Sequence, residues 1–127
     1  MTAERLANTF AVCAGFSACF QFALAGGAPW GRLTWGGKFP GRLPARMRIV
    51  AAFAAVLLLS FAVIVQVRTG VIATPWQPIS RKLIWIVVAY GGLGAVANAI
   101  TPSRWERIVW LPVVIALLVT SLLIATG

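Results

Sequence analysis

Charged residues in this chain are confined to the stretches before and between four long hydrophobic runs. Each run is close to the roughly 20 residues that an α-helix needs to cross about 30 Å of hydrocarbon. None of the four contains Lys, Arg, Asp or Glu, and such a residue costs about 3 kcal/mol at the centre of a membrane helix. The pattern predicts four membrane-spanning helices, near Leu6–Ala25, Ile49–Val67, Leu83–Ile100 and Ile108–Thr126.

The composition supports this prediction and sets the fold class. Of the 127 residues, 61% are hydrophobic and 10% are charged, whereas a soluble domain carries about 25% charged residues. We therefore predict an all-α, polytopic membrane protein, in which residues 1–127 form a single four-transmembrane-helix bundle.

The stretch between the first two predicted helices, residues 26–48, differs most from the rest of the chain. It holds six glycines, three prolines, two tryptophans and five cations, and it has no acid. We expect an ordered loop that lies along the membrane, with its tryptophans at the depth of the headgroups. Its candidate contacts with anionic lipid headgroups are Trp30, Arg32, Trp35, Lys38, Arg42, Arg46 and Arg48.

Two interpretations of this loop remain open. In the first, the tryptophans anchor the chain at the interface and the glycines and prolines only turn it. In the second, backbone amides form an anion-binding nest for a lipid phosphate, with help from Arg32 and Lys38. The amides of that nest would belong to Gly26, Gly27, Gly36 and Gly37.

The cations are unevenly divided between the two sides of the predicted membrane, and the formal net charge is +9. Four lie on the side of the amino terminus, namely Arg5, Arg68, Arg81 and Lys82. The other side holds Arg32, Lys38, Arg42, Arg46, Arg48, Arg104 and Arg107. Since cytoplasmic loops carry the excess of Lys and Arg, we expect the 26–48 loop in the cytoplasm and both termini outside. Cations beside apolar spans also argue against a nucleic-acid partner.

The side chains needed for most enzyme chemistry are missing from the sequence. It contains no histidine and no aspartate, so the commonest general base and metal ligand are absent. Cys13 and Cys19 point to different faces of one helix. The two acids, Glu4 and Glu106, start helices on opposite sides of the membrane. We expect no catalytic residues, no metal site, no cofactor and no enzyme activity.

A few neutral polar residues lie inside the predicted spans, and Gln21, Tyr90 and Asn98 are the most notable. They could form hydrogen bonds between helices, or they could line a small ligand site. The second interpretation gives an alternative function, a small-solute transporter or channel that acts as an oligomer. In length and helix number the chain resembles small four-helix drug exporters. Those proteins depend on a carboxylate in the first membrane helix, which residues 10–22 lack.

Two local patterns predict contacts. Small residues recur every fourth position at Ala7, Ala11, Gly15 and Cys19 and again at Gly91, Ala95 and Ala99. This spacing lets helices approach closely in lipid, so we expect the first and third helices to make the tightest contact, within one chain or between copies. We expect the second helix to face lipid more than these two do. Ser103 and Glu106 match a capping box, in which each side chain bonds the other residue's backbone amide.

Several short motifs resemble those of a family of small bacterial membrane proteins that has no assigned activity. They are Gly27-Ala28-Pro29-Trp30-Gly31, Trp35-Gly36-Gly37, Leu43-Pro44 and Asn98-Ala99 followed by Ser103 and Glu106-Arg107. The resemblance implies four helices and a bacterial inner membrane. We therefore expect a non-enzymatic binding or accessory protein that contacts anionic lipid headgroups or a membrane partner through residues 26–48. Its further partners would be copies of itself or a larger membrane complex.

Overall fold

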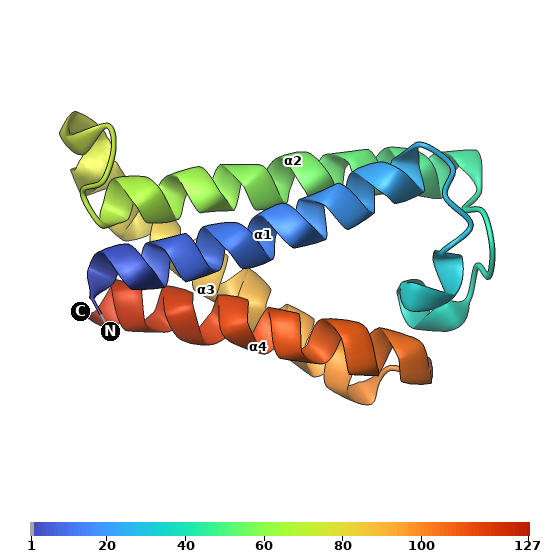
Figure 1. The fold of residues 1–127 in the computed structure, drawn as a ribbon. Helices are drawn as coiled ribbons and strands as arrows, with labels where there is room; N and C mark the ends of the chain where they lie inside the picture. The colour runs from blue at the N-terminus through green and yellow to red at the C-terminus, as the bar shows by residue number, and fades with distance from the viewer. Residues whose placement is uncertain (1) are drawn as a thin grey trace.

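The computed structural model describes residues 2–127, and within them the chain forms four long helices and no β-strand (Figure 1). Consecutive helices run in opposite directions, so both termini lie at one end of the bundle (Figure 1). All four helices are long and apolar enough to cross a membrane, which confirms the predicted all-α bundle of membrane helices. Their bounds are α1 Ala3–Ala25, α2 Ala45–Arg68, α3 Gln77–Ile100 and α4 Arg104–Thr126.

The helices extend beyond the apolar runs at their amino-terminal ends. α2 begins directly after Pro44, so Arg46 and Arg48 belong to a helix and the connecting loop is residues 26–44. α3 begins at Gln77, well before the predicted start at Leu83, with Pro78 in its first turn. Proline is tolerated there because the first amides of a helix have no partner within the helix. The thickness of the hydrocarbon layer sets the length of the apolar run, but it does not set the residues at which each helix begins and ends.

The four helices form a ring in chain order. α1 packs most extensively on α2, and α3 packs on α4, while contacts between α1 and α4 and between α2 and α3 join the two pairs. α1 and α3 lie diagonally opposite and hardly touch, so the predicted tight contact between the first and third helices does not form within one chain. A contact between copies stays a prediction. On α1, a Cβ added at Gly15 would meet no atom within 4 Å, and Cys19 is exposed.

The small residues of α3 serve a different contact from the one predicted. A Cβ at Gly91 would lie 3.0 Å from the Cα of Leu118, so Gly91 permits close packing of α3 on α4. The second helix was predicted to face lipid more than the first and third, and it is less buried than α1 but more buried than α3. It is more buried than α3 because α2 covers α1 along its length.

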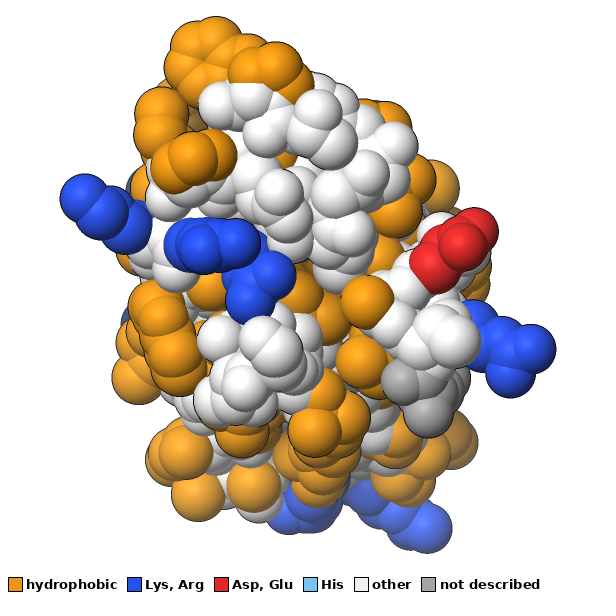
Figure 2. All heavy atoms as spheres, turned by 90° about the vertical axis from the view of Figure 1, so that its left-hand side faces the viewer, with side chains coloured by type: hydrophobic (Ala, Val, Ile, Leu, Met, Phe, Trp, Pro, Cys, Tyr) orange, Lys and Arg blue, Asp and Glu red, His pale blue; other side chains and the backbone are white. Residues whose placement is uncertain are grey.

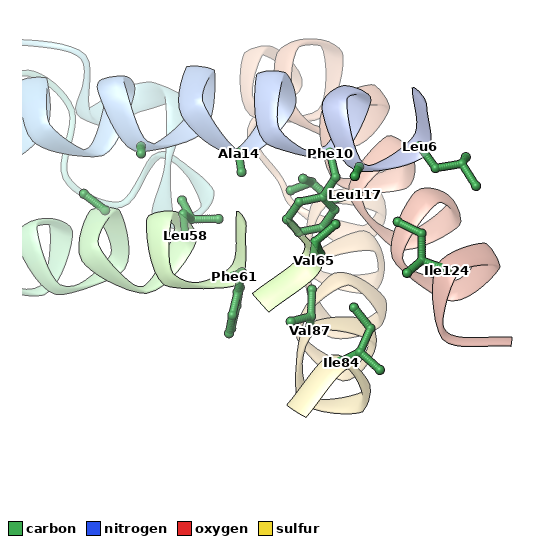
Figure 3. Packing of buried hydrophobic residues seen from close by; sticks show 13 residues of the cluster. Leu6, Phe10, Ala14, Leu58, Phe61, Val65, Ile84, Val87, Leu117 and Ile124 are labelled. Carbon is green, nitrogen blue, oxygen red and sulfur yellow. The ribbon is translucent and has the colours of Figure 1, made fainter. Parts of the chain in front are cut away.

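The main hydrophobic core fills the half of the bundle near the termini, and all four helices contribute to it (Figure 3). Phe10 is its largest fully buried side chain. Near the loop, a second and smaller cluster consists of Leu24, Leu43 and Ala51. At that end the ribbons of α1 and α2 diverge from those of α3 and α4, with the 26–44 loop beside them (Figure 1). Side chains such as Phe20 of α1 and Trp110 of α4 meet in the space between them. The loop half of the bundle is where a site can be built.

Candidate functional site

The 26–44 loop folds into a defined cap at one end of the bundle (Figure 1). It contains two single turns of 3-10 helix, η1 at Gly31–Leu33 and η2 at Trp35–Gly37. The amide of Gly31 donates a 2.8 Å hydrogen bond to the carbonyl of Gly41 and closes the loop on itself. Only glycine fits at position 31, because a Cβ there would overlap the carbonyl oxygen of Phe39.

The first turn of α4 holds this cap in place through two side chains. The hydroxyl of Ser103 donates a 2.7 Å hydrogen bond to the carbonyl of Arg32. Oε2 of Glu106 accepts a 2.8 Å hydrogen bond from the amide of Gly36. The Ser103 bond joins residues 71 positions apart in the sequence, and the Glu106 bond joins residues 70 positions apart.

The predicted capping box therefore forms only in part. Oγ of Ser103 does accept a 3.2 Å bond from the amide of Glu106 and caps the helix. The return bond is missing, because the Ser103 amide donates to Oγ1 of Thr101 instead. The carboxylate of Glu106 turns away from its own helix start and binds the loop.

The residues around Gly36 have an unusual backbone conformation. Trp35, Gly36 and Gly37 all have positive φ angles, of 52°, 64° and 76°. Glycine adopts such angles freely, whereas a residue with a Cβ such as Trp35 is strained there. The bond from the Gly36 amide to Glu106 helps to hold this conformation.

The backbone nest predicted for a lipid phosphate is absent. All four of its amides already donate hydrogen bonds inside the protein, so none remains for an anion. The amides of Gly26, Gly27, Gly36 and Gly37 donate to Phe22 O, Leu24 O, Glu106 Oε2 and Thr34 O respectively.

The predicted cations remain available as side chains, with one exception. Nε of Arg48 donates a 2.9 Å hydrogen bond to the carbonyl of Ala25, so Arg48 serves to cap the end of α1. The exposed cations of the loop and of the start of α2 are Arg32, Lys38, Arg42 and Arg46. Arg104 and Arg107, at the start of α4, are exposed at the same end.

Both loop tryptophans are about half exposed, with Trp30 at 46% and Trp35 at 51%. Trp30 also stacks on Phe20 of α1, with the two ring centroids 6.2 Å apart. At the opposite end of the bundle, cations stand among hydrophobic side chains around the termini (Figure 2). The ends of α1, α2 and α3 on that side carry Arg5, Arg68, Arg81 and Lys82.

Beneath the loop lies a cavity of about 130 Å³ that all four helices line. Gln21 of α1 and both Tyr90 and Asn98 of α3 border it, so the three intramembrane residues predicted as a possible site do lie together. Leu33 and Thr34 of the loop close it from the cap side, and Glu106 of α4 lines it too.

The polar groups of this cavity are poorly satisfied by the protein itself. Within residues 2–127, the side chains of Gln21 and Tyr90 make no hydrogen bond, and Asn98 only donates to the carbonyl of Gly94 at 2.8 Å. Trp110 is 8% exposed, and its buried Nε1 is without an acceptor in the described chain. These residues therefore do not form the hydrogen bonds between helices that the first interpretation expected.

Sequence reasoning missed Glu106 and Trp110 as site residues. A usable signal was their spacing, because positions 106, 110, 114 and 117 share one face of a helix. That face meets a second face with the same spacing on α3, which carries Tyr90, Gly94 and Asn98. No family model, no curated protein and no solved structure matches the chain. Function is therefore inferred from these residues and their contacts alone.

Proposed function

We propose that this is a non-enzymatic, multi-pass protein of a bacterial inner membrane that contacts anionic lipid headgroups through its loop end. The observation that carries the proposal is the set of exposed cations on a folded cap. Arg32, Lys38, Arg42 and Arg46 surround that end, and all four are exposed while the loop stays folded. A membrane protein partner would bind to the same surface if it presents acidic groups like those of the lipid headgroups.

The expected strength follows from the number of exposed cations. Each Lys or Arg near an anionic leaflet is worth about 1 kcal/mol, and this attraction falls off within a Debye length. Trp30 and Trp35 add an apolar body with a polar edge, which suits the interface. Arg48 is left out of the proposed contact because it already binds the carbonyl of Ala25.

The same charge distribution gives the proposed orientation. The loop end carries more cations than the end with the termini, so the positive-inside tendency places the loop in the cytoplasm and both termini in the periplasm. A reporter fused to the carboxyl terminus should then be active only outside the cytoplasm.

The lipid proposal can be tested with two matched triple variants. One is R32Q/R42Q/R46Q at the loop end, and the control is R5Q/R81Q/K82Q at the other end. Each removes three positive charges. The measurement is the amount of phosphatidylglycerol that co-purifies from mixed bilayers, quantified by mass spectrometry against phosphatidylcholine.

We expect the loop-end variant to lose most of its phosphatidylglycerol enrichment, since three contacts amount to about 3 kcal/mol. The control variant should keep most of it. If both variants lost phosphatidylglycerol enrichment equally, lipid binding would need only a cluster of cations and not the loop end in particular. No enrichment in the unmodified protein would refute the proposal outright.

A second candidate function is a small-solute transporter or channel that works as an oligomer. A specific observation favours it, namely the polar cavity lined by Gln21, Tyr90 and Asn98. An accessory protein can be packed solid, whereas a transporter needs such a space between its helices. Flux of solute into proteoliposomes, compared between the unmodified protein and Asn98→Leu, would test this function.

A further inference from the structure

We propose that the cavity beneath the loop is a binding site for a small organic cation, specifically a protonated amine of about four to six heavy atoms. The proposal does not depend on lipid contact at the loop end. It deepens the second candidate function by naming the chemical class that the cavity would take.

The size limit comes from the cavity volume of about 130 Å³. An engineered cavity of about 150 Å³ in another protein holds benzene, a molecule of six heavy atoms. Several water molecules would also fit, so water is the competing occupant.

The charge preference comes from the residues that line the space. Glu106 is the one formally charged side chain in the lining, and none of the chain's eleven cations borders the cavity. Glu106 is buried, with 9% of its surface exposed. A buried carboxylate is costly unless it is paired and hydrogen-bonded. Its hydrogen-bond partners are the amide of Gly36 and the side chain of Thr101. Both are neutral, so a positive ligand would supply the missing charge.

The remaining lining groups suit an ammonium group as well. The side-chain oxygens of Gln21, Tyr90 and Asn98 can accept hydrogen bonds, and Asn98 uses only its nitrogen in its bond to Gly94. The rings of Phe20 and Trp110 lie with centroids 4.5 Å apart in the wall. Aromatic faces attract cations, and more strongly where water is excluded.

A ligand that also carries a hydrogen-bond acceptor could pair with an unpaired donor in the wall of the cavity. Nε1 of Trp110 is buried and has no acceptor among residues 2–127. A buried donor without a partner costs free energy that a bound acceptor, or an ordered water, recovers. The site therefore favours an amine with a hydroxyl or ether oxygen over a purely hydrocarbon amine.

The experiment uses isothermal titration of the purified full chain in neutral detergent with two probes of the same size. Propylammonium chloride carries the charge, and 1-propanol is its uncharged counterpart. We expect binding of propylammonium and at least about tenfold weaker binding of 1-propanol, because close charge pairs contribute about 1.5 kcal/mol or more.

Two variants and a control locate the site. Glu106→Gln removes the charge and keeps an oxygen that can accept the Gly36 amide, so the loop should stay docked while propylammonium binds at least about tenfold more weakly. Asn98→Leu removes an acceptor at nearly constant size and should also weaken binding. Glu4→Gln removes the other acid of the chain, at the exposed far end, and should bind like the unmodified protein.

The proposal is overturned if the two probes bind equally, or if Glu106→Gln binds propylammonium as well as the unmodified protein does. It is also overturned if neither probe binds, since the cavity then holds only water. The titrations are made in neutral detergent, so a lost phosphatidylglycerol preference would leave their results unaffected and the two proposals fail separately.

Discussion

The hydrogen bond from the Gly36 amide to Glu106 is one of the two side-chain contacts that hold the cap on α4, and Glu106 also lines the cavity. We predict that Glu106→Ala releases the η2 turn from α4 and leaves the helices intact. The 2.8 Å bond from the Gly36 amide is lost, and the strained backbone of Trp35, with its φ of 52°, loses a contact that stabilises it. Alanine keeps the helix, because it is the best helix former.

The magnitude follows from the nature of the bond. A hydrogen bond to a charged group contributes about 1.5–3 kcal/mol, and a non-glycine residue with positive φ stores about 1–3 kcal/mol of strain. Losing about 2 kcal/mol of docking free energy raises the undocked fraction of the loop about 30-fold. Glu106→Gln keeps a neutral acceptor, worth about 1 kcal/mol, and should lie between alanine and the unmodified protein.

Hydrogen–deuterium exchange read by mass spectrometry measures this directly. In Glu106→Ala, peptides that cover residues 34–38 should exchange about 30-fold faster, while peptides within α2 should keep their rate. Unchanged exchange at 34–38 would refute the idea that Glu106 holds the loop. If the exchange rate in α2 rose as much as that in the loop, the substitution would have unfolded the bundle.

Three glycine substitutions test the packing. Gly91→Ala should destabilise the bundle by about 1–3 kcal/mol through overpacking, because its Cβ would lie 3.0 Å from the Cα of Leu118; an unchanged midpoint of denaturation in detergent would contradict the close α3–α4 contact. Gly15→Ala should stabilise the bundle by up to about 1 kcal/mol and so raise that midpoint slightly, since its Cβ meets nothing within 4 Å; a lower midpoint would indicate that Gly15 does make a close contact. Gly31→Ala should open the loop to protease because of the clash with Phe39; resistance equal to that of the unmodified protein would contradict it.

The membrane-helix bundle was predictable from sequence because uncharged apolar runs of about 20 residues are characteristic of helices that cross a bilayer. The helix ends were not. Arg46 and Arg48 extend α2 beyond its apolar run, since a helix can continue into the polar interface. Neighbours were mispredicted because α1 carries more than one row of small residues. Packing on α2 and α4 buried the row of Ala7, Ala14 and Ala18 and left Gly15 without a contact.

The candidate site was predictable only in part, for a related reason. Gln21, Tyr90 and Asn98 stood out because amides and phenols are rare in hydrocarbon, and the fold places all three on one cavity. Glu106 was assigned to a local capping box, since the motif needs only nearby residues. Its actual partner is Gly36, 70 positions away. A local sequence motif therefore identifies a side chain that can accept a hydrogen bond, but it does not identify the distant donor that makes that bond in the folded protein.

The positions of the charges also bear on how a cation would reach the cavity. Glu106 lies under a cap whose outer surface is cationic, so approach along the bundle axis is opposed by like charges. Thr34 and Glu106 also line a separate, mostly apolar groove of about 460 Å³ at the side, next to Trp35 and Ile100. If anionic headgroups bind the cap as proposed, they would neutralise its cations and concentrate organic cations from solution beside that groove. The two proposals then reinforce each other, and amine binding should be tighter in bilayers that contain phosphatidylglycerol than in neutral ones.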